Sequence, residues 1–518
     1  MDCQWTVNLV DKSEYKLANR SQRKQFMKAS SAIERRLTTL TQTLCTHAAR
    51  QPGERAFVFL NDNGQTQQTI TYRELVNHSK AIAAHLLQRV EPGDRVVLCY
   101  HPGLNFIQVF YACLFAGVVA VPVYPPKPRQ KFDRMGKIID SCQAKLVLCE
   151  QSIDLQSTVG DAPYLQDGRL LNTCELDLDT IDTSALPDVD AQHLAFLQYT
   201  SGSTGEPKGV MVSQGNIMAN MRALEEQTQC HKEDVFVNWL PLFHDLGLVN
   251  TVLLPMYLGS LSVLMPPIGF IQRPRLWLET ITEYRGSICG APNFAFDLCV
   301  ARIPQDDLDG LDLTCWKFAF NAAEPIHEAT LDNFVERFAP AGFPEYAFYP
   351  SYGMAEATVF LTGGKHDIKP RVLSYEQVVL DNNGSDDDED HSGKRLVSCG
   401  STPSEHQFKI VDSQTFKPLA QGCVGEIWVS GPSIAQGYWA LPERTAESFN
   451  AKMIGSDANW LRTGDLGCCF DEELYVTGRI KDLIVIHGQN FYPSDIEASV
   501  QGAHEALRKN AGVAFSIT

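Results

Sequence analysis

Short apolar segments alternate with longer amphipathic stretches along most of the chain from Ile33 onward. Residues 70–90 (ITYRELVNHSKAIAAHLLQRV) repeat apolar side chains at helical spacing behind a threonine, which predicts a capped amphipathic helix. Strands are predicted for the apolar runs GDRVVLCY (93–100), GVVAVPVY (117–124), KLVLCE (145–150) and HLAFLQYTSG (193–202). This alternation predicts an α/β fold in which helices flank mostly parallel sheets.

The pattern changes in the second half of the chain. Residues 365–395 break it and read as an inserted segment, and the short β-rich runs that follow, such as GEIWVSG (425–431), predict a small β-subdomain. We therefore expect a flexible N-terminal arm over residues 1–30 and a large domain over 31–480 that contains the insertion. Residues 481–518 then begin a small α+β C-terminal domain with a strand, a glycine turn and an amphipathic helix.

The insertion carries an acidic run from Asp386 to Asp390. A calcium-binding loop is one interpretation of such a run. The spacing lacks the glycine and the distal glutamate of an EF-hand, so we interpret the run as a solvated loop.

Two uncharged runs, 102–126 and 246–272, are long enough to cross a membrane. The first divides at Gly117 into a helical half and a β-branched half, and the second is interrupted at Pro255 and at the pair Pro266–Pro267. Buried helix-to-strand units of an α/β protein explain both runs better than membrane spans do.

Composition narrows the class of protein further. A chain of 518 residues with 44% hydrophobic and 20% charged residues is typical of a globular enzyme. The formal net charge of −18 argues against a dedicated binder of nucleic acid or of anionic membranes, since both need a basic surface. The 15 cysteines show neither CxxC pairs nor zinc-ligand spacing, which favours buried free thiols in a reducing cytosol.

The stretch QYTSGSTGEPKGVMVSQGN (198–216) has the composition of an anion-binding loop between two strands. Its glycines expose backbone N–H groups, its hydroxyls add donors, and Lys208 supplies a cation, so a nucleotide polyphosphate suits it. A Walker P-loop would continue as Gly-Lys-Ser/Thr into a helix, whereas Lys208 stands between Pro207 and Gly209 ahead of a strand. A flexible linker would not lie directly between two apolar strands.

Two further stretches offer candidate chemistry. NWLPLFHDLGL (238–248) places His244 in a loop after an apolar strand, although a histidine in such a place is often merely structural. FYPSYGMAEA (348–357) places aromatic side chains near Gly353 and a carboxylate at Glu356, which suits a stacked base and a bound cation.

The last two stretches lie near the C-terminus. WLRTGDLG (460–467) offers Asp465 in a turn, where a carboxylate can accept both hydroxyls of a ribose, although this tripeptide is also common in turns for local reasons. GRIKDLIVIHGQN (478–490) places Arg479 and Lys481 at the junction of the two predicted domains.

Taken together and in this order, the five stretches resemble the acyl-adenylate-forming superfamily, which includes acyl-CoA synthetases, adenylation domains and luciferase. The resemblance makes 31–480 the adenylating domain. It implies that the residues that bind ATP or AMP are Thr200, Ser201, Gly202, Ser203, Thr204, Gly205, Lys208, Ala322, Ala323, Glu324, Ser351, Tyr352, Gly353, Met354, Asp465 and Arg479.

The same resemblance implies more specific roles. Lys208, His244 and Glu356 are the expected catalytic residues: Lys208 faces the pyrophosphate, Glu356 binds Mg²⁺, and His244 stands beside the incoming carboxylate. Adenine is expected to stack on Tyr352 and to be flanked by the backbone of NAAEP (321–325). Lys481 resembles the hinge about which the small C-terminal domain rotates between the two half-reactions.

One departure from the family concerns the C-terminal domain. The family carries a catalytic lysine near the end of that domain, and this sequence stops at Thr518, soon after Lys481. We therefore expect a truncated chain or a fragment of a longer one, which binds ATP and an acyl chain but adenylates slowly.

Within the superfamily the chain most resembles fatty acyl-AMP ligases, because of WLPLFHDLGL, of APNFAFDLC (291–299) and of the insertion after TGG (362–364). In that branch an insertion at this place disfavours CoA as the acyl acceptor. APNFAFDLC is expected to place Phe294 on a helix beside the acyl chain, although an apolar helix face is more often plain core.

The resemblance implies a bacterial cytosolic enzyme that uses ATP and Mg²⁺ to convert a fatty acid into acyl-AMP. The acyl group would then pass to the phosphopantetheine thiol of an acyl carrier protein. Two alternatives stay open at this point, a fatty acyl-CoA synthetase and a non-catalytic homologue that binds an acyl chain or a nucleotide.

Overall fold

The computed structural model of the protein describes residues 38–125, 133–150, 169–201, 206–378, 395–486, 489–491, 493–503 and 512–515. The predicted N-terminal arm over 1–30, the acidic run Asp386–Asp390 and the loop residues 202–205 lie outside the described residues.

The larger of two main sheets has eight strands, and its interior strands run parallel. Across the sheet the strands are β14 (Phe360–Gly363), β13 (Phe348–Gly353), β12 (Phe318–Asn321), β11 (Ile288–Ala291), β9 (Val235–Asn238), β10 (Leu261–Leu264), β1 (Arg55–Leu60) and β2 (Thr66–Thr71). The outer strands β14 and β2 pair antiparallel. The carboxyl ends of β9, β11, β12 and β13 consequently meet at one edge, where open α/β sheets bind their ligands.

The second main sheet has six strands with the same design. Its order is β6 (Leu170–Asn172), β5 (Leu146–Cys149), β3 (Arg95–Cys99), β4 (Val119–Val123), β7 (Leu194–Ser201) and β8 (Pro207–Ser213). All neighbours pair in parallel except β7 and β8, which form an antiparallel hairpin. The strands β3, β4, β5 and β7 fall within the four runs predicted from the sequence, whereas β6 and β8 lie outside them.

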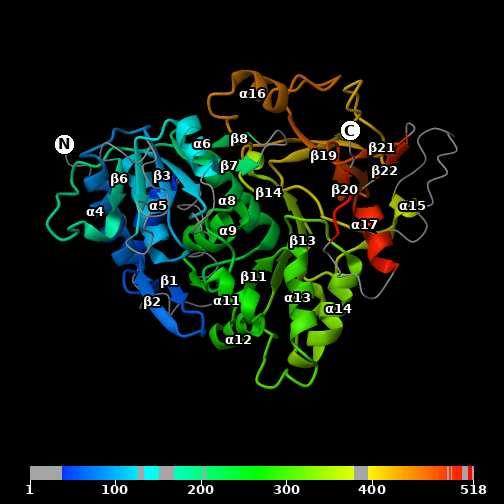
Figure 1. Ribbon diagram of the computed structural model, residues 1–518, viewed down its shortest axis with the longest axis horizontal. Coiled ribbons are helices and arrows are strands. Elements are labelled where there is room, and N and C mark those ends of the chain that lie inside the picture. The colour runs from blue at the N-terminus through cyan, green and yellow to red at the C-terminus, as the bar shows by residue number, and fades with distance from the viewer. Residues whose placement is uncertain are drawn as a thin grey trace, which may run out of the picture.

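Helices fill the space between the two sheets and cover their outer faces (Figure 1). The helical elements of this region are α3 (Leu40–Arg50), α4 (Tyr72–Leu86), α5 (Leu104–Ala116), α6 (Asp133–Cys142), η2 (Thr173–Glu175), α8 (Gln214–Thr228), α9 (Asp245–Leu248), η3 (Val249–Leu253), α10 (Leu254–Leu258), α11 (Pro267–Gln272), α12 (Arg275–Tyr284), α13 (Asn293–Arg302), α14 (Glu328–Phe338), η4 (Ala339–Ala341), η5 (Glu345–Ala347) and η6 (Ala355–Ala357). Thr71 and Glu74 form the capping box that begins α4, as the sequence predicted.

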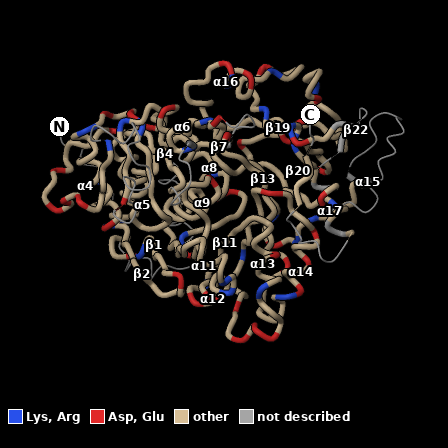
Figure 2. Tube along the Cα trace, viewed as in Figure 1, with Lys and Arg blue, Asp and Glu red and all other residues tan. Residues whose placement is uncertain are grey.

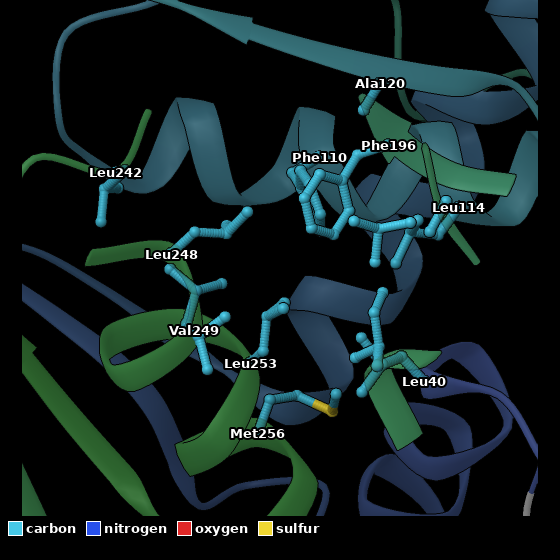
Figure 3. Packing of buried hydrophobic residues seen from close by; sticks show 14 of the residues in the cluster. Leu40, Phe110, Leu114, Ala120, Phe196, Leu242, Leu248, Val249, Leu253 and Met256 are labelled. Atoms are coloured by element: carbon cyan, nitrogen blue, oxygen red, sulfur yellow. The ribbon is translucent and has the colours of Figure 1, made fainter. Parts of the chain in front are cut away.

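The central layer is the largest apolar core. Figure 3 shows Phe110 of α5 beside Phe196 of β7, and Leu40 of α3 near Met256 of α10. Alternate side chains of both sheets point into this layer, which is why their strands read as continuous apolar runs. On the far faces, α12, α13 and α14 cover the larger sheet and α6 covers the smaller.

Both uncharged runs fold as buried helix-to-strand units. The first forms α5 and β4, separated by Gly117 at φ +66°. In the second, Pro255 was expected to interrupt the helix, but α9, η3 and α10 continue through it, because Pro255 follows a π-helical turn at the start of α10, where a missing N–H costs little. Within the described residues, no helix is both long and apolar enough to cross a membrane. Figure 2 shows how uncharged the chain is through α5 and β4.

A four-stranded antiparallel sheet forms the predicted β-subdomain. It consists of β17 (Gln407–Val411), β18 (Gly425–Ser430), β19 (Leu461–Phe470) and β20 (Glu473–Arg479), with α16 (Pro442–Phe449) beside it. The described ends of the insertion form β15 (Val372–Ser374), α15 (Tyr375–Val378) and β16 (Arg395–Val397). The last elements are β21 (Ile484–Ile486), β22 (Gln489–Phe491) and α17 (Pro493–Gly502), so the predicted strand and helix of the C-terminal part are joined by one further strand. The domain boundary at residue 480 stays a prediction.

Candidate active site

The anion-binding loop is shorter than its sequence indicated, because the hairpin of β7 and β8 extends into it. Thr200 pairs with Lys208, and Ser201 pairs with Pro207, so these residues belong to strands. The predicted loop residues Gly202, Ser203, Thr204 and Gly205 lie outside the described residues. Lys208 therefore projects from a paired strand rather than from a free loop.

Lys208 faces other cations as well as an aromatic ring. Its Nζ lies 5.1 Å from the centre of the Tyr438 ring. Burial lowers the pKa of Lys208, and the positive charges of Lys481 and Arg444 lower it further, while Glu356 acts in the opposite direction. Three cations that share one region form a place suited to a polyanion.

Glu356 lies just past the end of β13, in the short helical turn η6. Gly353 makes the preceding bend possible, because a Cβ there would stand 1.6 Å from the carbonyl oxygen of Val359. The Glu356 side chain is buried and accepts a hydrogen bond of 2.8 Å from the Tyr438 phenol. Burial raises the pKa of Glu356, and the nearby carboxylates of Asp245 and Asp465 raise it further.

Asp465 was expected in a turn, but it lies in the strand β19, directly opposite Arg479 of β20. The antiparallel pairing lets one carboxylate bind two partners: Oδ1 accepts from Arg479 Nε at 2.9 Å, and Oδ2 accepts from the Tyr352 phenol at 2.7 Å. Asp465 is 6% exposed, and burial raises its pKa although the Arg479 charge lowers it. A carboxylate has about four lone-pair sites, so two stay open for further donors.

The NAAEP stretch follows β12 at the same sheet edge. Ala323 adopts a φ of +72°, a conformation uncommon for a residue with a side chain, and such strain clusters at functional sites. Glu324 accepts a hydrogen bond of 2.5 Å from the backbone N–H of Phe294. The stretch predicted to flank adenine is thereby tied to the first turn of α13, where the acyl chain was predicted. Ala322 and Met354 stand at the ends of β12 and β13, and Ser351 lies within β13.

His244 caps the short helix α9 and contacts its neighbour Asp245. Its Nδ1 lies 2.7 Å from Asp245 Oδ1, and this hydrogen bond raises the pKa of His244. The side chain is 54% exposed, and its partial desolvation lowers the pKa of His244 against the effect of Asp245. Gln198 of β7 donates a hydrogen bond of 3.0 Å to the Phe243 carbonyl, which ties this loop to the Lys208 hairpin.

Phe294 lies in the first turn of α13, as predicted, and is 37% exposed. Its ring stands edge-on to Trp239, with 6.1 Å between the centroids, and Trp239 stacks on Phe270 at 4.0 Å. These three rings form an apolar wall beyond the carboxyl end of β9. The acyl-binding role of Phe294 stays a prediction, and so does the hinge role of Lys481, which stands in the turn after β20.

Sequence reasoning missed two residues of this region, Tyr438 and Arg444. Tyr438 precedes α16 and Arg444 lies in its first turn. Neither stands in a stretch whose composition indicates a ligand, so their place near Lys208 could be found only after folding.

The donor set fits a magnesium ion that is also bound by phosphates. The Glu356 carboxylate accepts a hydrogen bond from the Tyr438 phenol at Oε1 and interacts with its own backbone N–H. The described residues contain no group of three or more metal-ligating side chains. Mg²⁺ in nucleotide sites commonly takes one or two carboxylates together with phosphate oxygens and water, which matches this arrangement.

Comparison with known proteins agrees with this geometry. The family model of the AMP-binding enzymes matches residues 44–439. Over 93% of the chain and 83% of the relative, the sequence is 36% identical to the medium-chain fatty acid–[acyl-carrier-protein] ligase JamA of Moorena producens. It is 34% identical to the long-chain fatty acid–AMP ligase FadD32 of Mycolicibacterium smegmatis, over 89% of the chain and 76% of that protein.

A solved structure gives the same result. The fatty acyl-adenylate ligase of Legionella pneumophila, in complex with acyl adenylate and pyrophosphate, is 39% identical with a TM-score of 0.81, over 94% of this chain and 85% of that one. The chain belongs to the AMP-binding enzyme family and, within it, to the fatty acyl-AMP ligases of the acyl-adenylate-forming superfamily.

Proposed function

We propose that the protein activates a fatty acid with ATP to fatty acyl-AMP and pyrophosphate, and passes the acyl group to the phosphopantetheine thiol of an acyl carrier protein. The observation that carries the proposal is the position of Glu356. It lies within electrostatic reach of Lys208 on one side and of Asp465 on the other, so groups suited to pyrophosphate and to ribose share one site.

In the first step a carboxylate oxygen of the fatty acid attacks the α-phosphorus of ATP. The bond from that phosphorus to the oxygen bridging the β-phosphate breaks, and pyrophosphate leaves. Asp465 and Arg479 hold the ribose, Tyr352 carries the adenine, and Lys208 faces the charge that develops on the leaving group. Such catalysis consists mainly of positioning and electrostatic stabilisation.

Glu356 is the residue that would hold Mg²⁺, which supplies charge neutralisation between phosphate oxygens. The burial of Glu356 and its electrostatic coupling to Lys208 support this assignment. His244 stands beside Asp245 with its side chain 54% exposed, and its protonated form would attract the incoming carboxylate.

In the second step a thiol sulfur attacks the acyl carbonyl carbon and AMP leaves, while the thiol proton passes to solvent. We assign the thiol to a carrier protein because one similar ligase is named for that acceptor and because the chain carries the insertion at 365–395. A cytoplasmic location supports both steps, since ATP is available there and buried free thiols such as Cys113 and Cys289 stay reduced.

The test uses the full-length protein with ATP, Mg²⁺ and a mixture of fatty acids. One reaction contains CoA, a second contains a phosphopantetheinylated carrier protein, and mass spectrometry identifies the acylated products. We expect acyl-AMP to persist beside CoA and acyl-carrier to form in the second reaction. The variant Glu356→Gln should form little acyl-AMP, and Tyr349→Phe, whose buried phenol has no hydrogen-bond partner among the described residues, is the control.

The other outcomes separate the alternatives. Rapid formation of acyl-CoA would make the protein a fatty acyl-CoA synthetase. ATP binding without any acylated product, in the presence of each acceptor, would make it a non-catalytic homologue.

A further inference from the structure

Tyr438 contacts two oppositely charged groups of the candidate site at once. Its phenol donates a hydrogen bond of 2.8 Å to Glu356 Oε1, and Lys208 Nζ lies 5.1 Å from the centre of its ring. An ammonium within about 6 Å of an aromatic face is attracted by the ring quadrupole. One side chain thus binds the residue expected to hold the metal and the residue expected to face the pyrophosphate.

The ring of Tyr438 is fixed from several directions. The backbone on either side of it pairs with β8, since Trp439 N donates to the Gly209 carbonyl at 2.8 Å and Met211 N donates to the Gly437 carbonyl at 2.9 Å. The amide of Tyr438 donates to Thr445 Oγ1 of α16 at 2.9 Å. The Tyr438 side chain is 7% exposed, and a ring held this firmly can set the position of its partners.

Because Tyr438 contacts both Lys208 and Glu356, these two opposite charges stay apart. Lys208 and Glu356 attract each other, yet no ion pair within 4.0 Å joins them, although both are described in the structure. A direct pair would neutralise the ammonium and occupy the carboxylate, leaving less of either for phosphate or metal. Tyr438 satisfies each group separately and keeps both available.

We propose that Tyr438 is a positioning residue that holds the metal-binding carboxylate of Glu356 and the phosphate-binding ammonium of Lys208 apart and in register. This inference rests on the proposed function and adds a residue to it. The Tyr438 phenol contacts Glu356 and the Tyr438 ring contacts Lys208, so the two contacts can be removed one at a time.

The experiment measures the affinity for α,β-methylene-ATP by calorimetry, without fatty acid, once in EDTA and once in Mg²⁺. Tyr438→Phe keeps the ring and removes the phenol. We expect the gain in affinity due to Mg²⁺ to fall about tenfold, the effect of one hydrogen bond to a charged group. The affinity for the nucleotide in EDTA should stay within about twofold of the wild type, because the aromatic ring still attracts the Lys208 ammonium.

A second variant, Tyr438→Leu, removes the ring as well. It should weaken binding in EDTA too, because Lys208 then loses its support and turns toward Glu356. Tyr349→Phe is the matched control, since it removes a buried phenol that has no hydrogen-bond partner among the described residues. It should bind like the wild type in both buffers.

Three results would overturn the inference. One is a Tyr438→Phe variant that keeps the full gain from Mg²⁺. Another is an equal loss of affinity in both buffers with a lowered thermal midpoint, which would mean a purely structural role. If the wild type itself fails to bind the nucleotide in either buffer, the proposed function fails together with the inference.

Discussion

The Tyr352 phenol donates a hydrogen bond of 2.7 Å to Asp465 Oδ2, which joins the end of β13 to the small antiparallel sheet. The residue expected to carry adenine is thus bonded to the residue expected to hold ribose. In the proposed function, the side chains assigned to the base and to its sugar therefore hold each other in place.

Removal of this phenol tests that pairing. Tyr352→Phe keeps the aromatic face but leaves the buried Asp465 carboxylate with one hydrogen-bond partner fewer. We expect KM for ATP to rise about tenfold, since a hydrogen bond to a charged group contributes about 1.5–3 kcal/mol. Steady-state kinetics at varied ATP check this, and KM for the fatty acid should stay unchanged. Equal KM values for ATP in the variant and the wild type would contradict the pairing.

Asp465 itself gives a second prediction. Asp465→Asn removes the charge that faces Arg479 and leaves the guanidinium without its anionic partner. Because the Arg479 side chain is 66% exposed, water compensates it, and the thermal midpoint should change little. Nucleotide affinity, measured by calorimetry, should fall at least about tenfold. A large fall in thermal midpoint with normal nucleotide affinity would show that the pair serves only the fold.

The third prediction concerns pH. The hydrogen bond that His244 donates to Asp245 raises the pKa of His244 above its usual 6.5, so this contribution to stability is present at low pH and is lost as pH rises through the raised value. Asp245→Asn should lower the pKa of His244, as NMR titration of the imidazole would show. With the wild type, KM for the fatty acid should rise over the same pH range in which His244 loses its charge. An unchanged imidazole titration in the variant would refute the assignment.

Gly353 supplies a fourth prediction. An added Cβ would stand 1.6 Å from the carbonyl oxygen of Val359, so Gly353→Ala must displace backbone between Tyr352 and Glu356. We expect a destabilisation of more than about 3 kcal/mol by denaturant unfolding, together with loss of ATP binding. Gly53→Ala is the control, because no atom lies within 4 Å of the Cβ it would add. Comparable stability of the two variants would contradict the close approach.

Much of the fold could be predicted from the sequence because its signals are local. The helix that begins after Thr71 and the strands β3, β4, β5 and β7 follow from apolar spacing and a cap, whereas the helix that contains Phe294 was expected from the family resemblance. The continuation of the helix through Pro255 was not predictable, since it depends on a π-helical turn that packing selects. Periodicity also does not report which strands become neighbours.

The candidate site also contains residues that local sequence signals indicate and residues that only the folded structure brings together. Lys208, Glu356 and Asp465 stand in stretches whose composition indicates a ligand, and they could be named before folding. Asp465 was nevertheless placed in a turn, because the glycine before it resembles a turn signal, whereas the pairing with Arg479 keeps it in a strand. No local sequence signal marks Tyr438, because its partner Glu356 lies 82 positions away in the chain.

The groups around the candidate site come from three different sheets: Lys208 from the six-stranded sheet, Tyr352 from the eight-stranded one and Asp465 from the small antiparallel one. A nucleotide bound among them would act as a non-covalent crosslink between the three sheets. By mass action, such a ligand stabilises only the form in which all three are docked. Proteolytic cleavage of the small sheet should therefore slow when ATP is present, long before any acyl group is transferred.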